Sequence, residues 1–308
     1  MSKVTVVGAG NVGATCANVL AHKDLVKEVV LLDIQGDLAR GKALDSWQQA
    51  PIDYYSTRLK GTEDYKDTAG SDIVVITAGV PRKPGMSRDD LISTNAKIVN
   101  MVTKSIMAHS KNPIIIVVSN PLDVMTYAAY KASGLDSSRV FGMAGILDTA
   151  RYRAFLADAL HISPKDIQAV LMGGHGDTMV PLPRYSTVAG IPITQLMPPD
   201  RVEAIVQRTR KGGGEIVSLL KQGSAFFAPS AATMQMVEAI LKDRQMILPC
   251  SVYLQGEYGL DDICFGVPVK LGRNGVEQIL EIELTAEEQE GLSKSAELIR
   301  SSMEALQL

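Results

Sequence analysis

The sequence has few cysteines and no long hydrophobic run, and these shortages exclude several classes of protein. Its three cysteines, Cys16, Cys250 and Cys264, are odd in number and widely spaced, so they indicate neither a disulfide framework nor a metal-ligand motif. A reducing, cytoplasmic setting fits them best. The longest aliphatic run, 114–118, is far shorter than the roughly 20 residues that cross a bilayer. No signal peptide is recognisable, so we expect a cytoplasmic protein with no bound metal and no membrane partner.

The chain also lacks an excess of positive charge. Its formal net charge is -3, whereas a domain that binds nucleic acid usually carries a basic patch or stripe. We therefore expect no nucleic-acid partner. With 308 residues, of which 46% are hydrophobic, the chain is long enough to bury one large core or the cores of two domains.

Short β-branched runs alternate with amphipathic helical patterns in the first half of the chain. Each run is continuously apolar and bounded by Gly, Asp or Asn, as expected of parallel strands buried on both faces. The predicted strands are 4–7, 29–33, 73–77 and 114–118, and the predicted helices are 11–22, 36–49 and 88–109. This α/β alternation predicts a doubly wound parallel sheet with right-handed crossovers.

The regular alternation stops after about residue 141. The predicted helices are then 145–160, 200–222, 229–243 and 285–306, and the predicted strands are 167–172, 246–254, 263–271 and 275–280. A polar, proline-rich stretch lies between the strand at 167–172 and the helix at 200–222. We therefore predict two domains, over residues 1–143 and 144–308, the second of them α+β.

A glycine-rich turn joins the first predicted strand to the first predicted helix. Gly8 permits the tight turn, Gly10 lets a ligand approach the backbone, and Gly13 lets the helix pack on the strand. The helix then begins at Asn11 and Val12, where free N–H groups and the positive end of the helix dipole favour phosphate groups. The glycine spacing predicts a dinucleotide site of the Rossmann type.

An acidic residue at the end of the second predicted strand defines the dinucleotide further. Asp33 lies 20 residues past Gly13, where its carboxylate can accept hydrogen bonds from both ribose hydroxyls and would repel a 2′-phosphate. We therefore predict that residues 1–143 form an NAD-binding Rossmann domain. The alternative, a glycine turn in an unrelated βα unit, leaves Asp33 unexplained.

Two further turns follow predicted strands at their carboxyl ends, where open α/β sheets bind their ligands. Their residues are Thr77, Ala78 and Gly79 after one strand, and Val118, Ser119, Asn120 and Pro121 after another. The bond between Asn120 and Pro121 is a candidate cis peptide, since X–Pro bonds adopt that geometry at little energetic cost. The alternative for each turn is an ordinary strand ending that binds nothing.

One histidine stands among glycines, in the segment Gly173-Gly174-His175-Gly176-Asp177. A histidine titrates near neutral pH, as a group that both donates and accepts a proton must. Asp148 is the candidate carboxylate to fix its tautomer. Arg151 lies on the same helix face as Asp148 and can bind a substrate carboxylate through two parallel hydrogen bonds. The alternative for His175 is a histidine in a strand-ending turn, without catalytic function.

As a set, these motifs closely resemble the lactate/malate dehydrogenase family, and within it the lactate-dehydrogenase-like malate dehydrogenases. The resemblance covers essentially the whole chain. It rests on Gly-Ala-Gly-Asn-Val-Gly, Thr-Ala-Gly, Ser-Asn-Pro, the pair Asp148 and Arg151, Gly-Gly-His-Gly-Asp, and the segment Pro-Arg-Lys-Pro-Gly-Met-Ser-Arg at 81–88. It implies NAD as the cofactor, malate and oxaloacetate as the small-molecule substrates, and a catalytic function for residues 144–308.

The resemblance also implies a role for each residue of the site. His175 corresponds to the general acid and base, and Asp148 to its orienting partner. Arg151 would bind the C1 carboxylate of the substrate, and Asn120 would donate a hydrogen bond to a substrate oxygen. Arg88, on a mobile loop, would polarise the reacting carbonyl when the loop closes over the site.

Two more positions matter for the cofactor and for substrate selection. Asn95 corresponds to a residue near the cofactor. Arg82 occupies the family position that selects the substrate side chain, which is glutamine in lactate dehydrogenases and arginine in malate dehydrogenases. A buried arginine at that position needs an anion, and oxaloacetate supplies a second carboxylate where pyruvate has only a methyl group. Ala225 stands where lactate dehydrogenases have a threonine-bearing segment, which leaves room for the larger substrate.

Other classes of protein remain as alternatives. A lactate dehydrogenase would need glutamine, not arginine, at position 82, and another 2-hydroxy-acid dehydrogenase is a further alternative. A non-catalytic NAD-binding module would not need His175, Asp148 and two loop arginines. An NAD-dependent glycosidase would be longer and would use a metal. The resemblance further implies a homo-oligomer, tetramer or dimer, for which 36–49 and 215–240 are plausible contact surfaces.

Overall fold

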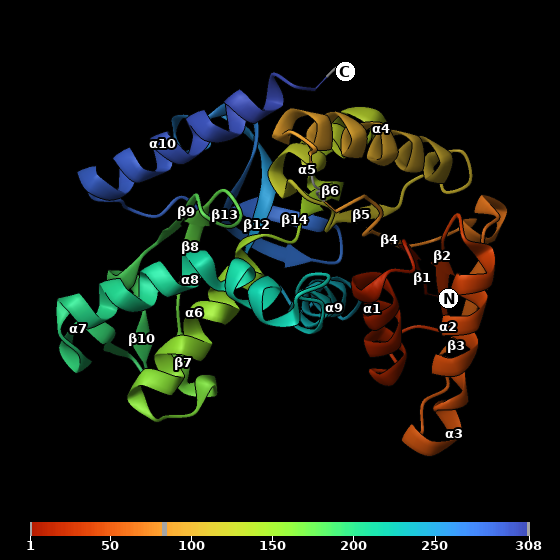
Figure 1. The fold of residues 1–308 in the computed structure, drawn as a ribbon, viewed down its shortest axis with the longest axis horizontal. Helices are drawn as coiled ribbons and strands as arrows, with labels where there is room; N and C mark the ends of the chain where they lie inside the picture. Colours follow the sequence, from red (N-terminus) through yellow and green to blue (C-terminus); the bar gives the residue numbers. More distant parts are fainter. Residues whose placement is uncertain (1, 82–84, 307–308) are drawn as a thin grey trace.

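The computed structural model describes residues 2–81 and 85–306, and its centre is one large mixed sheet (Figure 1). Six parallel strands form its first part in the order β3-β2-β1-β4-β5-β6. These strands are β1 (Lys3–Val7), β2 (Glu28–Leu32), β3 (Arg58–Thr62), β4 (Ile73–Ile76), β5 (Ile114–Val117) and β6 (Val140–Gly142). This is the strand order of a Rossmann domain, and the predicted fold class is confirmed.

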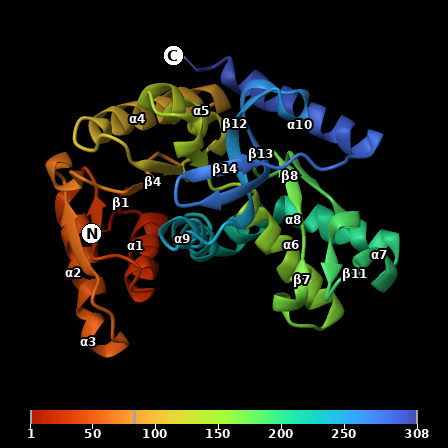
Figure 2. The ribbon, with the colours of Figure 1, turned by 180° about the vertical axis from the view of Figure 1, so that it is seen from behind.

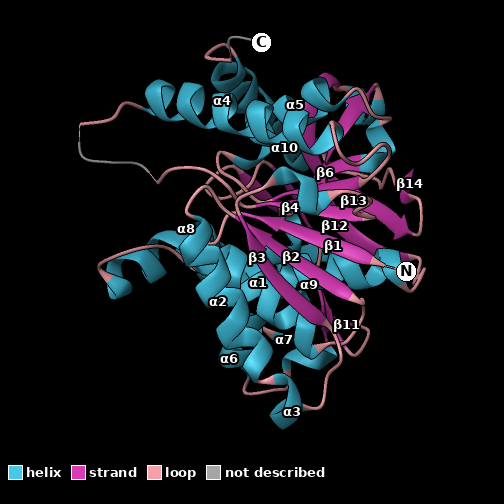
Figure 3. Cartoon of the chain, turned by 90° about the vertical axis from the view of Figure 1, so that its right-hand side faces the viewer, coloured by secondary structure: helices cyan, strands magenta, loops and turns pink. Residues whose placement is uncertain are grey.

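Helices cover both faces of this sheet (Figure 3). The helices of the first half are α1 (Asn11–His22), α2 (Gly36–Gln48), α3 (Ala50–Asp53), α4 (Arg88–Met107) and α5 (Leu122–Ser133). Helices α4 and α5 pack on one another on one face, and α1 and α2 cover the other face. The side chains of β4 and β5 are all buried, because a parallel strand between two helical layers has no solvent-exposed side.

The second half of the chain extends the same sheet with antiparallel strands. It contains α6 (Gly145–Leu160), α7 (Ile193–Leu196), α8 (Pro199–Leu220), α9 (Phe227–Leu241) and α10 (Ala286–Met303). Its strands are β7 (Ile167–Gln168), β8 (Leu171–Gly173), β9 (Met179–Pro181), β10 (Thr187–Val188), β11 (Ile191–Pro192), β12 (Met246–Gln255), β13 (Asp261–Gly272) and β14 (Gly275–Ile279). Of these, β7, β10 and β11 form a separate three-stranded sheet, and the others extend the large sheet. Strand β12 pairs with β6 through Ser251 and Gly142, which joins the two parts into one sheet.

Helix α9 connects the two halves of the molecule. It packs against α1 of the first half and α6 of the second, and it lies between them in both views down the short axis (Figures 1 and 2). The hydroxyl of Ser230 on α9 donates a hydrogen bond to the carbonyl oxygen of Val12, at 3.0 Å. The first turn of α1, which contains Val12, is therefore held by a residue more than 200 positions away in the sequence.

Several elements differ from those that the sequence predicts. The sequence patterns miss β3, β6 and α5, and the single strand predicted at 167–172 is in fact two short strands, β7 and β8, which lie in different sheets. β3 is an edge strand with exposed polar side chains, so it lacks an apolar run. The proline-rich stretch contains β9, β10 and β11, each of two or three residues. Within the described residues, no helix combines the length and the apolar character needed to cross a membrane.

Candidate active site

The glycine-rich turn between β1 and α1 is built by close backbone contacts. Gly8 has φ +106°, a left-handed conformation that a residue with a side chain rarely adopts. A Cβ atom added to Gly13 would lie 1.8 Å from the carbonyl oxygen of Gly8, so α1 approaches the end of β1 more closely than any side chain allows. The two glycines that the sequence assigns to the turn and to helix packing thus have those positions in the structure.

Asp33 lies directly after β2 and faces the glycine-rich turn. Its Oδ2 atom accepts a hydrogen bond from the backbone N–H of Ala9 at 2.6 Å, and its Oδ1 atom accepts one from the N–H of Gln35 at 2.9 Å. The carboxylate is therefore fixed beside the turn, and each oxygen has a second lone pair for a ribose hydroxyl. A phosphate at the same place would meet a negative charge.

The start of α1 fits the pyrophosphate of a dinucleotide. A Cβ atom added to Gly10 would meet nothing within 4 Å, so open space lies in front of the helix. No side chain of the described residues caps the helix, and no acidic residue lies in its first turn. The N–H groups of that turn are thus available to an anion. Together with Asp33, these features match NAD.

Asn95, on α4, joins the two turns that follow β4 and β5. Its side-chain oxygen accepts a hydrogen bond from the N–H of Val80 at 2.8 Å, and its amide nitrogen donates to the carbonyl oxygen of Asn120 at 2.7 Å. Ser119 donates through its hydroxyl to the carbonyl oxygen of Ala78 at 2.5 Å, which ties the same turns together a second time. The peptide bond between Asn120 and Pro121 is cis, as predicted.

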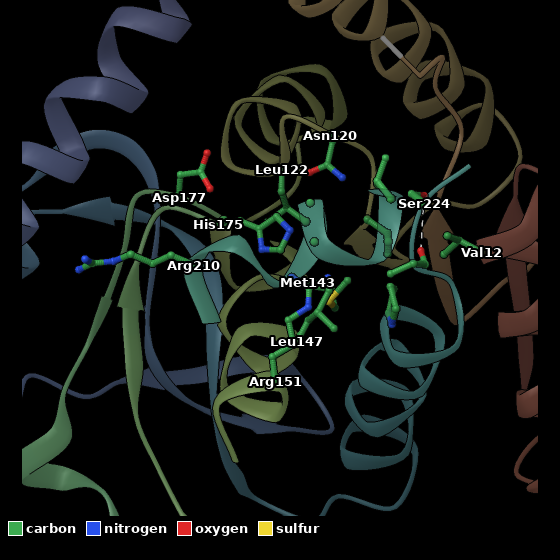
Figure 4. A pocket seen from close by; sticks show the side chains of 17 residues that line it. Val12, Asn120, Leu122, Met143, Leu147, Arg151, His175, Asp177, Arg210 and Ser224 are labelled. Carbon is green, nitrogen blue, oxygen red and sulfur yellow. Dashed lines mark hydrogen bonds between the residues drawn. The ribbon is translucent and has the colours of Figure 1, made fainter. Parts of the chain in front are cut away.

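His175 lies in the turn after β8, and its ring is bound by a carboxylate from α6. The Nδ1 atom of His175 lies 2.8 Å from Oδ2 of Asp148, whose side chain is only 2% exposed. Because a buried carboxylate accepts hydrogen bonds, Nδ1 carries the hydrogen and Nε2 is left for a ligand. In Figure 4 the imidazole lies between Asn120 above it and Arg151 below it. The structure thus brings together the acid–base pair that the sequence predicts.

Electrostatics favour the protonated form of His175. Burial lowers the pKa of its imidazole, but the negative charge of Asp148 and the hydrogen bond to it act in the opposite direction and prevail. The negative charge of Asp123 also raises this pKa, and the positive charge of Arg151 lowers it. The resulting pKa lies above the ordinary value for histidine, which suits a group that donates a proton near neutral pH.

Arg151 is largely buried but weakly paired. Its Nη1 atom lies 3.4 Å from Oδ1 of Asp148, its side chain is 12% exposed, and its Nε atom has no partner among the described residues. Gly212 and Gly213 of α8 face it, and a Cβ atom at Gly212 would lie 3.1 Å from Cδ of Arg151. Burial lowers the pKa of Arg151, so an incoming anion would relieve an uncompensated charge.

His175, Arg151 and Asn120 line a cavity of about 380 Å³ (Figure 4). Val12 and Val118 line it from the cofactor side, so the predicted cofactor site opens directly into it. Ala225 and two residues of the histidine turn, Gly176 and Asp177, also line it. The sequence indicates no such role for the remaining lining residues, which are Leu122, Met143, Leu147, Arg210, Gly213, Gly214, Val217, Ser224 and Pro229. Ala225 is thus in the pocket, as the resemblance implies.

The two loop arginines have different positions. Arg88 is the first residue of α4, is exposed, and lines a neighbouring cavity that also contains His175 and Asn120. Arg88 does not line the cavity described above. Arg82 lies outside the described residues.

The sequence reasoning missed Asp123, the second residue of α5. Its Oδ2 atom accepts a hydrogen bond from the backbone N–H of His175 at 3.0 Å. The sequence offers one signal, since Asp123 comes shortly after the predicted strand at 114–118 and two residues after Pro121, whose peptide bond is cis. The other histidines, His22, His109 and His161, lie at or near helix ends.

Comparisons with known proteins show the family of this chain. The family model for the NAD-binding domain of lactate/malate dehydrogenases matches residues 2–142, and the model for the α/β C-terminal domain of that family matches residues 146–307. The chain belongs to the lactate/malate dehydrogenase family.

Individual relatives carry both enzyme names. A malate dehydrogenase of Cytophaga hutchinsonii is 60% identical over 305 residues, which is 99% of this chain and 97% of the relative. The structure of a malate dehydrogenase from Salinibacter ruber matches with a TM-score of 0.95 at 54% identity, covering 99% of this chain and 97% of that one. A lactate dehydrogenase from Cryptosporidium parvum, in complex with lactic acid and NAD, matches with a TM-score of 0.94 at 38% identity, covering 98% and 97%. The fold alone therefore does not select the substrate.

Proposed function

We propose that this chain is an NAD-dependent malate dehydrogenase, which transfers a hydride reversibly between (S)-malate and NAD to give oxaloacetate and NADH. The observation that carries the proposal is the cavity in which the His175–Asp148 pair and the weakly paired Arg151 adjoin the dinucleotide turn. Full-length malate dehydrogenases at 52–60% identity support the choice of substrate. A non-catalytic NAD-binding module would have no use for a histidine and a guanidinium arranged in this way.

Proton transfer in this mechanism belongs to His175. In oxaloacetate reduction the imidazolium gives its Nε2 proton to the carbonyl oxygen, and in malate oxidation the neutral ring accepts the hydroxyl proton. Asp148 keeps the ring in the orientation that presents Nε2 and stabilises the charged form. When bound, the nicotinamide cofactor donates the hydride to C2 or receives it from C2.

Substrate binding uses two arginines near His175, which are Arg151 and Arg88. Arg151 binds the C1 carboxylate, which offers its guanidinium a closer anion than the long contact to Asp148 and a partner for its Nε atom. Asn120 donates a hydrogen bond to the reacting oxygen. Arg88, which already adjoins His175 through the neighbouring cavity, stabilises negative charge on that oxygen when the loop at 80–90 closes and excludes water.

Arg82 discriminates between oxaloacetate and pyruvate. In the closed site its guanidinium pairs with the second carboxylate of oxaloacetate. With pyruvate the charge would be buried without a partner, at a cost of about 3–5 kcal/mol. Arginine at this position, together with the small Ala225 in the pocket, supports malate over lactate as the substrate.

Two features of organisation belong to the same proposal. We divide the chain into an NAD-binding domain over 1–143 and a catalytic domain over 144–308, which agrees with the ranges of the two family-model matches. We place the protein in the cytoplasm, since its three cysteines are buried and free.

We further propose a homo-oligomer that forms through α2 and residues 215–240, which comprise the end of α8, the segment after it and most of α9. Large apolar side chains are exposed there, among them Leu44, Leu219 and Phe227, and exposed apolar patches usually mark interaction sites. The molar mass measured by sedimentation should be that of a dimer or tetramer, and Leu219→Glu should lower it. A monomer at micromolar concentration would contradict this proposal.

The function is tested by following malate oxidation with NAD and identifying oxaloacetate as the product. His175→Asn is the matched control, because asparagine keeps a polar side chain of similar size without acid–base function near neutral pH. Turnover by the unmodified chain and its loss in His175→Asn are expected. If the chain bound NAD but did not turn over malate, the proposed function would be wrong and the chain would be a non-catalytic NAD-binding module.

A further inference from the structure

A second buried carboxylate, that of Asp123, lies at His175 and has no part in the mechanism described above. Asp123 is 5% exposed. Its Oδ2 atom accepts a hydrogen bond from the backbone N–H of His175 at 3.0 Å, and its Oδ1 atom accepts one from the hydroxyl of Ser251 on β12 at 2.7 Å. Each oxygen of Asp123 therefore accepts one hydrogen bond, and the two donors come from different parts of the fold. One of these donors is the backbone N–H of His175, the residue that transfers the proton.

The turn that carries His175 is held from three helices. Ser295 of α10 accepts a hydrogen bond from the N–H of Gly174 at 2.9 Å, Asp123 of α5 accepts one from the N–H of His175, and Asp148 of α6 binds the imidazole. Asp148 fixes the ring and Asp123 fixes the backbone that bears it. Of the two groups that hold the backbone, Ser295 is neutral and Asp123 is a carboxylate.

The charge state of Asp123 follows from opposing influences. Burial, together with the negative charge of Asp148, raises the pKa of Asp123 above its ordinary value, although the hydrogen bonds from His175 and Ser251 and the positive charge of His175 act in the opposite direction. A carboxylate in the first turn of a helix also interacts favourably with the helix dipole. A buried carboxylate that accepts two hydrogen bonds and lies beside an imidazole stabilises the imidazolium form of that ring.

We propose that Asp123 is a positioning residue for the dehydrogenase reaction, which fixes the backbone of His175 and adds a second negative charge that favours its imidazolium form. This inference rests on the proposed function, because it assigns Asp123 a role in proton transfer by His175. Other charged groups also surround His175: Asp148 of α6 bonds to its ring, and the two cavities around it are lined by Arg151 of α6, Asp177 of the same turn, Arg88 of α4 and Arg210 of α8. Among them Asp123 alone bonds to the His175 backbone.

Asp123→Asn tests the charge while it preserves the shape. The asparagine oxygen can still accept from the N–H of His175, and its amide can donate to Ser251. Loss of the charge should move the ionisation of His175 to lower pH, and each unit of such a shift reduces the protonated fraction about tenfold at higher pH. We expect kcat/KM for oxaloacetate to fall at least about threefold at pH 8, whereas kcat/KM for malate at pH 6 should be unchanged or higher.

Ser295→Ala is the matched control, since it removes the neutral hydrogen bond at the adjacent residue. Its pH profile should keep the wild-type position whatever happens to the absolute rate. If Asp123→Asn does not fold, Ser251→Ala replaces it. Loss of the hydrogen bond from Ser251 raises the pKa of Asp123, so a smaller fraction of this carboxyl group is ionised. We therefore expect the pKa of His175 to shift in the same direction as in Asp123→Asn, but by less. An equal loss of rate at every pH in Asp123→Asn would reduce Asp123 to a structural residue and overturn the proposal.

A titration of His175 by NMR separates this proposal from the proposed function. The chain has four histidines, and His175→Asn identifies the signal of His175 in protein labelled at histidine Cε1. We expect this signal to titrate at lower pH in Asp123→Asn than in the unmodified chain, whether or not malate is a substrate. Coincident titration curves would overturn the role of the charge even in an active enzyme.

Discussion

Asp148 and Arg151 lie one helical turn apart on α6, and the Asp148 carboxylate divides its two oxygens between Arg151 and the imidazole of His175. Oδ2 lies 2.8 Å from Nδ1 of His175, whereas Oδ1 lies 3.4 Å from Nη1 of Arg151. The first contact is a short, charge-assisted hydrogen bond and the second is long and weak. Asp148 therefore belongs to the acid–base pair, and Arg151 remains available for the substrate.

Removal of the charge of Asp148 should impair catalysis far more than folding. In Asp148→Asn the amide can bind His175 in the wrong tautomer, and the imidazolium loses its closest negative charge. We expect kcat/KM for oxaloacetate to fall by about 10²-fold or more. Steady-state kinetics beside a thermal melt would check this, and a variant with wild-type kinetics would exclude Asp148 as the partner of His175.

The two directions of the reaction should depend on pH in opposite ways. The pKa of His175 lies above its ordinary value, with burial opposing and Asp148 favouring the charged form. Oxaloacetate reduction needs the imidazolium, so its kcat/KM should fall as pH rises through that pKa, while that of malate oxidation should rise. Profiles measured in both directions should share one pKa above about 6.5. A shared pKa below the ordinary value would contradict the electrostatics of the pair.

The substrate preference should depend on one loop residue. Arg82→Gln removes the guanidinium that needs a second carboxylate, so the ratio of kcat/KM for oxaloacetate to that for pyruvate should fall by roughly 100-fold or more. A lysine-to-glutamine change at the neighbouring Lys83 is the control for loss of positive charge on the loop. An unchanged ratio in Arg82→Gln would show that substrate selection lies elsewhere.

Two glycines of the dinucleotide turn should respond differently to the same substitution. In Gly13→Ala the new Cβ would clash with the carbonyl oxygen of Gly8, and such overpacking costs about 1–3 kcal/mol or more of stability. In Gly10→Ala the Cβ enters open space, so the fold should be retained and the KM for NADH should rise. Thermal melts and NADH titrations compare the two, and equal stability losses would contradict the packing described for Gly13.

Local patterns predicted the parts of the site that are continuous in sequence. The glycine turn, Asp33 and the histidine turn each follow a buried apolar strand, and the cis bond before Pro121 was indicated by the Asn-Pro pair. In these places the residue type alone defines the backbone geometry that the site needs.

Contacts between distant elements could not be predicted in the same way. The prediction missed α5, and with it Asp123, because the helix is mostly buried and has no regular polar face. Only the packing of α8 on α6 shows that Gly212 and Gly213 face Arg151. The edge strand β3 pairs with β2, and the three-residue strand β6 pairs with β5. Both strands lack a strong apolar pattern in their own sequence, so their place in the sheet depends on these neighbours.

The most direct test of the account is a side-by-side measurement of kcat/KM for oxaloacetate and pyruvate with NADH, on one preparation of the unmodified chain. We predict rapid oxidation of NADH with oxaloacetate, a kcat/KM that is lower by roughly 100-fold or more with pyruvate, and little activity when NADPH replaces NADH. A preference for pyruvate would contradict the assignment of malate as the substrate, although it would leave the acid–base pair of His175 and Asp148 intact.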